Sequence, residues 1–168
     1  MFVALLRAVN VGGTGKIAMS DLKALCERIG FEDVRTYIQS GNIVFRSDRD
    51  PAAARALLAK ALAARMNSPV GVQVRSAAQL RRTLAGNPFP QAPPNRVIVF
   101  FLDAPPEKGT LDDLVIPGNE EVRPVGREIF VHYPDGQGRS KLRLPQMKAG
   151  TGRNLNTIAA LVEMSGRR

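Results

Sequence analysis

The sequence has no tryptophan, one cysteine and one histidine, and aromatic residues make up only 5% of it. A single cysteine excludes a disulfide within the chain. One cysteine and one histidine together also argue against a zinc cluster or a Cys/His catalytic pair. Cys26 falls on the apolar face of a predicted helix and His132 within an apolar strand, so we expect both to be structural. No metal or other cofactor is predicted.

Long apolar runs are also missing, since none approaches the roughly 20 residues that a membrane-spanning helix needs. The first apolar run, Phe2–Leu6, is too short for a signal sequence and no basic segment precedes it, which indicates a buried strand. We therefore expect a cytoplasmic protein with no membrane partner. The sequence does not predict an oligomeric state.

Motifs typical of catalysis are scarce. The chain contains neither GxSxG nor HExxH, and the glycines after Val11 lack the spacing of a P-loop or a dinucleotide fingerprint. The acidic pairs Asp112-Asp113 and Glu120-Glu121 have no metal-ligand or basic partner at a diagnostic spacing, so we expect them to be solvated. The sequence therefore favours a protein that is not an enzyme. An enzyme of unknown reaction is the third interpretation, after the two kinds of binding protein described below.

Positive charge, by contrast, is plentiful: the formal net charge is +9. A basic protein attracts polyanions, so nucleic acid is a candidate partner. An arginine-rich and alanine-rich composition also follows from GC-rich coding, and these two origins of the charge stay open. The excess is local as well, because residues 136–162 contain no acidic residue. The same span contains five cations: Arg139, Lys141, Arg143, Lys148 and Arg153.

The hydrophobic pattern predicts a β-α-β-β-α-β order in the first half of the chain. Ser20 is expected to cap the first helix, which Gly30 ends, and Asp50-Pro51 to open the second. The expected strands are 2–6, 34–38, 43–46 and 70–75, and a third helix is expected over 76–85.

The second half predicts β-α-β-β-α, which repeats the first half without its last strand. The expected strands are 97–102, 121–125 and 128–133, and the expected helices are 108–114 and 154–164. The fold class is therefore α+β, with two ferredoxin-like (βαββαβ) units, the second incomplete, and antiparallel sheets with helices on one face. We expect a first unit over 1–86, a proline-rich linker over 87–95 and a second unit over 96–168.

Polar clusters with glycine follow three of these elements and are the candidate ligand site. Parallel strands end at the same edge of a sheet, so the loop at Asn10 and the hairpin at Ser40 should be neighbours. The third cluster begins the last helix, whose free amides and Arg153 could hold an anion, and we expect it to face the Gly12-Gly13 loop. The candidate residues are Asn10, Gly12, Gly13, Lys16, Gln39, Ser40, Asn42, Arg153, Asn154 and Asn156.

These residues favour binding of a small anionic or nucleotide-like ligand, which amide side chains would orient. The alternative is binding of RNA or single-stranded nucleic acid, because the RNA recognition motif is also ferredoxin-like. The segment Gly41–Phe45 is faintly similar to the RNP1 strand of that motif. Nucleic-acid binding ranks second because neither face of this strand carries the two aromatic residues on which bases stack.

The segments Leu5–Gly13 and Thr36–Phe45, with Met19 and Leu22 between them, resemble the opening of the bacterial domain-of-unknown-function family 1697. Residues 152–157 are similar to the closing motif of that family. This chain has Leu155 where the family commonly has tryptophan, and glycine at 152 where alanine is common. The resemblance implies a compact fold of two similar halves and a bacterial, cytoplasmic setting, and it supplies no substrate.

Overall fold

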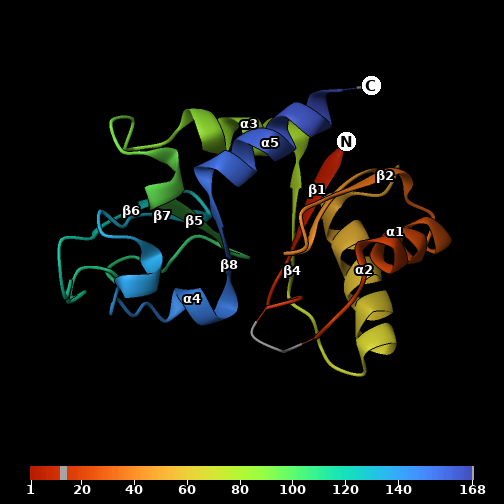
Figure 1. Cartoon of the computed structure of the whole chain (residues 1–168), viewed down its shortest axis with the longest axis horizontal. Coiled ribbons are helices and arrows are strands. Elements are labelled where there is room, and N and C mark those ends of the chain that lie inside the picture. Colours follow the sequence, from red (N-terminus) through yellow and green to blue (C-terminus); the bar gives the residue numbers. More distant parts are fainter. Residues whose placement is uncertain (12–14, 168) are drawn as a thin grey trace. The chain divides into compact units, whose positions relative to one another are not determined.

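The computed structural model describes residues 1–11 and 15–167, and its chain divides into two compact units (Figure 1). Unit 1 comprises Met1–Arg81 and Ala160–Arg168, and unit 2 comprises Arg82–Ala159. The chain leaves unit 1 within α3 (Ala77–Ala85) and returns to it within α5 (Leu155–Gly166). Over the described ranges, no helix combines the length and apolar character that crossing a bilayer requires.

Unit 1 has the predicted β-α-β-β-α-β order. Its sheet is antiparallel with strand order β2-β3-β1-β4, so β1 and β2 run parallel on either side of β3. This is the ferredoxin-like arrangement. The elements are β1 (Phe2–Leu6), α1 (Met19–Arg28), β2 (Glu32–Tyr37), β3 (Asn42–Arg46), α2 (Pro51–Met66) and β4 (Val72–Ser76).

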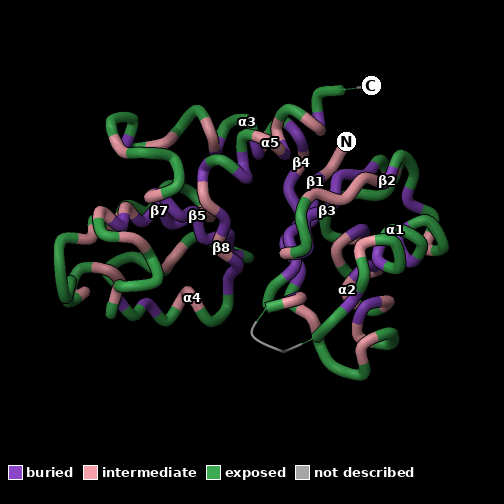
Figure 2. Tube along the Cα trace, viewed as in Figure 1, coloured by how far each residue is buried: buried purple, intermediate pink, exposed green. Residues whose placement is uncertain are grey.

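Helices α1 and α2 cover one face of this sheet, as Figure 1 shows. Alternate residues of β1, Ala4 and Leu6, join Leu22 of α1 and Leu58 of α2 in one buried cluster. Figure 2 shows the strands of unit 1 as largely buried and the outer turns of its helices as exposed. The two-residue period of the strand and the 3.6-residue period of the helices thus meet in one core.

The starts of the two helices differ from each other. Asp50 caps α2 as predicted, since its Oδ1 accepts a hydrogen bond from the Ala53 amide at 2.8 Å. The prediction that Ser20 caps α1 is wrong. The helix begins at Met19, after Ala18, and no side chain caps it. A serine one residue inside a helix satisfies the same sequence pattern as a serine just before it, so the pattern alone misplaced the boundary.

Unit 2 repeats the sheet of unit 1, with strand order β6-β7-β5-β8. The last strand was predicted to be missing but is present as β8 (Thr151–Asn154), whose small and polar residues give no strand signal. The remaining elements are β5 (Val97–Phe101), β6 (Glu121–Val125), β7 (Glu128–His132), α4 (Gln146–Ala149) and the 3-10 turns Pro94–Arg96 and Gln137–Arg139.

Unit 2 departs from the ferredoxin-like pattern in its helices and not in its sheet. The helix predicted over 108–114 is instead a series of turns, in which each backbone bond spans three residues. Gly109 has a φ of 87° there, which an α-helix does not accommodate. The helix before β8 is only four residues long. Apolar residues of β5 nevertheless pack with Leu142 and Leu144 in a core of their own.

The two sheets share an unusual detail, a buried arginine on the strand that precedes a helix. Arg75 of β4 pairs with Val3, and Arg153 of β8 pairs with Val99, so the two arginines occupy equivalent positions. In each unit the residue after the arginine caps the following helix with its side-chain oxygen. The repeat expected from the order of elements therefore extends to single residues.

Candidate functional site

Asn10 joins the loop after β1 to the turn after β2. Its Nδ2 donates to the Gln39 carbonyl at 2.9 Å and to the Ile17 carbonyl at 2.8 Å. Its Oδ1 accepts from the Ile17 amide at 2.9 Å. The predicted adjacency of the Asn10 loop and the hairpin turn is confirmed by the contact with Gln39.

The backbone at this junction is strained. Ala8, Asn10 and Ile38 have φ values of 55°, 56° and 48°, in the left-handed region. That region costs an L-residue about 1–2 kcal/mol, and a β-branched residue there is an outlier. Asparagine tolerates it best, and Asn10 gains three hydrogen bonds in return. Strain of this kind gathers at ligand clamps and active sites, which marks the junction as a candidate site.

A depression of about 460 Å³ opens beside the junction, and Lys16 and Gln39 are exposed on it. Arg65 of α2 reaches it as well and pairs with Asp21 at 3.6 Å, with both side chains about half exposed. Two cations and one carboxylate leave the rim with a net positive charge. The lining residues are Asn10, Lys16, Ile17, Ala18, Met19, Asp21, Gln39 and Arg65.

Ser40 and Asn42, also predicted as ligand residues, hold the turn itself. Asn42 is fully buried, and its Nδ2 donates to the Tyr37 carbonyl and to the Ser40 hydroxyl, both at 3.0 Å. Gly41 between them has a φ of 81°. The predicted ligand residues Gly12 and Gly13 lie outside the described residues.

Arg153, Asn154 and Asn156 belong to unit 2. Arg153 is 8% exposed and lies on β8, where its guanidinium donates to the Thr151 hydroxyl at 2.7 Å and the Gly152 carbonyl at 2.9 Å. Burial lowers the pKa of this guanidinium to about 10. Asn154 accepts from a backbone amide as the cap of α5, and Asn156 is exposed. An anion site formed by these three residues stays a prediction.

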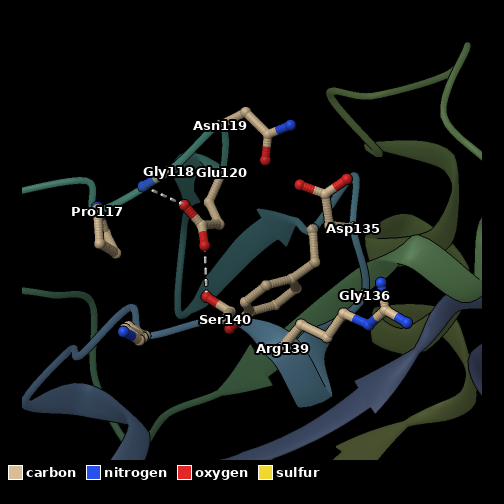
Figure 3. Close-up of a pocket in the computed structure, with 10 residues that line it drawn as sticks. Pro117, Gly118, Asn119, Glu120, Asp135, Gly136, Arg139 and Ser140 are labelled. Carbon is tan, nitrogen blue, oxygen red and sulfur yellow. Dashed lines mark hydrogen bonds between the residues drawn. The ribbon is translucent and has the colours of Figure 1, made fainter.

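Unit 2 has a hollow of about 540 Å³, which Figure 3 shows. Glu120 accepts from the Ser140 hydroxyl at 2.6 Å and from the Gly118 amide at 3.0 Å. The hydrogen bond from Ser140 is the main cause of the lowered pKa of Glu120. The two hydrogen bonds of this carboxylate join the loop at Gly118 to the segment at Ser140. Sequence spacing could not have found the contact with Ser140, because 20 residues separate the partners.

Cys26 is fully buried in the core of unit 1, and burial raises the pKa of its thiol to about 12. A thiol in this setting is not a nucleophile near neutral pH. His132 lies beside Glu121, with 3.6 Å between Nδ1 and the carboxylate, and its ring is 5.6 Å from that of Phe89. Across the described residues, no three His, Cys, Asp or Glu side chains gather as a metal site would require.

The fold thus defines an α+β protein of two ferredoxin-like units, with a basic, strained junction in unit 1. The sequence profile of a family described as "Protein of unknown function (DUF1697)" matches residues 1–130, and the chain belongs to this family. The match ends before residues 152–157, which resemble the closing motif. A search of curated proteins found no match.

Among solved structures, the chain is similar to that of a conserved bacterial protein, SP0830 from Streptococcus pneumoniae. The two share 23% sequence identity with a TM-score of 0.76, over 98% of this chain and 97% of that one. At this identity the similarity shows a common fold across both units. The similarity does not indicate a ligand or an activity for this chain.

Proposed function

We propose that the protein binds a small anionic ligand in the depression beside the Asn10–Gln39 junction. The observation that carries the proposal is the set of three hydrogen bonds made by Asn10. They fix the two polar segments against each other and so hold Lys16 and Gln39 on one concave surface. A site held in place before its ligand arrives loses less conformational entropy on binding.

The charges around the depression support an anion. Lys16 is exposed and makes no ion pair with the described residues. Within the described part of the chain, Arg65 makes one ion pair, its half-exposed pair with Asp21, and such surface pairs contribute about 0–1 kcal/mol. Both cations can therefore turn to a ligand at little cost. The net charge of +9 raises the local concentration of anions around the protein.

The test is a titration with inorganic phosphate at constant ionic strength, followed by calorimetry and by thermal unfolding. Phosphate at a hundredfold excess over Kd should stabilise the fold by about 2.7 kcal/mol. Lys16→Ala should remove most of this effect. Lys60→Ala, which removes an exposed lysine on the same helix as Arg65, is the matched control and should leave it unchanged. Equal responses of these two variants would contradict the proposal.

Nucleic-acid binding is the second candidate, and one observation in unit 2 favours it. Leu142 and Leu144 are buried, while Arg139, Lys141 and Arg143 are exposed between and before them. Alternation with the buried leucines places Lys141 and Arg143 on the same side of the segment, and two residues of extended chain span about 6.6 Å. Arg139 precedes them within the 3-10 turn Gln137–Arg139, and the three cations together suit a phosphate backbone.

The aromatic residue of the segment that is similar to RNP1 is not available for stacking on a base. Phe45 is fully buried and stacks on Phe31 with 4.1 Å between ring centroids, so its ring belongs to the core. Fluorescence anisotropy with a labelled oligouridine tests the candidate. Binding that weakens with salt and is lost when Arg139, Lys141 and Arg143 become alanine would support it, and no binding at low salt would exclude it.

A further inference from the structure

Tyr133 presents a buried hydroxyl that the fold does not use. The residue is 2% exposed and belongs to the apolar core of unit 2, together with Ile129 and Leu142. It also lines the hollow of that unit, and its hydroxyl makes no hydrogen bond with the residues that the structure describes. Among these residues, the side-chain oxygen that is both fully enclosed and without a partner belongs to Gln146, so the Tyr133 oxygen is open to the hollow. Phenylalanine would fill the same core without a polar atom to satisfy, and a partner for the hydroxyl must come from the hollow.

Glu120 adds a fixed negative charge near this hydroxyl. Its carboxylate accepts from the Ser140 hydroxyl at 2.6 Å and from the Gly118 amide at 3.0 Å, the two dashed lines of Figure 3. These hydrogen bonds hold the carboxylate in one place. Burial raises the pKa of Tyr133 to about 12, and the charge of Glu120 adds to this effect, so the carboxylate lies within electrostatic reach of the hydroxyl.

A protonated amine matches these two groups. An ammonium has three donors and no acceptor, whereas an ionised carboxylate only accepts and a phenol oxygen can accept as well. Over the described ranges, Glu120 makes no ion pair, so no cation of the protein neutralises its charge by direct contact. A hydrogen bond from an ammonium to a carboxylate is one of the stronger kinds in proteins.

The lining of the hollow also carries positive charge. Arg139 and Lys141 line it together with Glu120 and Asp135, so the formal charge of the four side chains is zero. None of the four forms an ion pair with a described residue. A ligand of one sign would therefore meet like charges in the lining, whereas a ligand with both signs would meet a partner for each.

We propose that the hollow of unit 2 binds a free α-amino acid, with its ammonium group between Glu120 and Tyr133 and its carboxylate on Arg139 and Lys141. This site goes beyond the anion site proposed for unit 1, and neither depends on the other. The hollow of about 540 Å³ has the size of a small-molecule site. The buried ring of Tyr133 and the two hydrogen bonds of Glu120 hold the ammonium site in place before the ligand arrives, which lowers the entropic cost of binding.

The experiment titrates the full chain with each of the standard L-amino acids separately, followed by calorimetry and by thermal unfolding. At least one amino acid should bind with saturation. Its N-acetyl derivative, which lacks the ammonium charge, and its decarboxylated amine should each bind at least about tenfold more weakly, the size of one lost charge-assisted hydrogen bond.

Tyr133→Phe is the most informative variant, because it removes the hydroxyl and no hydrogen bond of the described fold. It should weaken the amino acid about tenfold and unfold at the same or a higher temperature. Tyr37→Phe, at the other tyrosine of the chain and in unit 1, is the matched control and should leave the affinity unchanged. Glu120→Gln keeps an oxygen for Ser140 but loses the charge, so it should weaken the amino acid at least as much as Tyr133→Phe.

Four results would overturn the proposal. The first is that none of the standard amino acids binds, and the second is that Tyr133→Phe or Glu120→Gln binds as the wild type does. The third is that the decarboxylated amine binds as tightly as the amino acid, which would show that Arg139 and Lys141 take no part. The fourth is a lower unfolding temperature of Tyr133→Phe, which would show that the hydroxyl serves the fold.

Discussion

Replacing Asn10 by alanine should loosen the junction on which the proposed site depends. The change removes three hydrogen bonds, each with a net contribution of about 0.5–1.5 kcal/mol. It also puts alanine at a φ of 56°, which costs about 1 kcal/mol. Water replaces part of the lost bonding because the contact with Gln39 is exposed. We therefore expect a loss of about 2–3 kcal/mol.

Equilibrium unfolding in urea, followed by circular dichroism, measures this loss directly. The midpoint of thermal unfolding should fall by about 5–10 °C, from the usual 2–4 °C per kcal/mol for a chain of this size. Asn10→Asp keeps the acceptor for Ile17 but turns a carboxylate towards two carbonyl oxygens, so it should be no more stable than the alanine variant. Asn119→Ala, at an exposed asparagine of unit 2, is the control. A change below 0.5 kcal/mol in Asn10→Ala, about the size of an ordinary surface substitution, would refute the reasoning.

Two further predictions concern the core of unit 1. The raised pKa of Cys26 means that its stabilising effect is complete below pH 9 and is lost as the pH rises towards 12, because the unfolded chain releases the thiol proton first. Urea midpoints measured from pH 8 to 11 should therefore fall more steeply for the wild type than for Cys26→Ala, and parallel curves would contradict this. Gly41→Ala should destabilise the protein by about 2–4 kcal/mol, because φ is 81° and the new Cβ would lie 2.8 Å from Cβ of Leu6. A urea midpoint equal to that of the wild type would show that the turn does not need glycine.

Sequence patterns predicted unit 1 better than unit 2, for a physical reason. The core strands and helices of unit 1 carry long apolar periods, and its turns carry Gly30, Gly41 and Asp50-Pro51 at the expected positions. In unit 2, β8 consists of Thr, Gly, Arg and Asn, and its pairing with β5 is a long-range contact that no local pattern reports. The region 108–114 has a helical spacing of apolar residues but a glycine that turns the chain.

The part of the candidate site that depends on strand order alone, the adjacency of the Asn10 loop and the hairpin, was predictable from the sequence. Parallel strands end at one sheet edge, and this alone predicts that Asn10 lies beside the hairpin. The strain at Ile38 was not predictable, because only the backbone conformation reveals it. The burial of Arg153 was missed as well. An arginine before a helix suggests an exposed anion ligand. Its place in the sheet, on the face opposite to that of Ile98 and Phe100, follows only from the pairing with Val99.

The most direct test of the anion site is a two-dimensional amide NMR titration of the wild-type protein with inorganic phosphate, with chloride at matched ionic strength as the reference. Saturable shifts are expected at the amides of Lys16, Ile17 and Gln39, which line the depression in unit 1. Shifts should be absent at Gly118 and Lys141 in the hollow of unit 2. Shifts confined to unit 2, or equal shifts with phosphate and chloride, would contradict the proposed anion site.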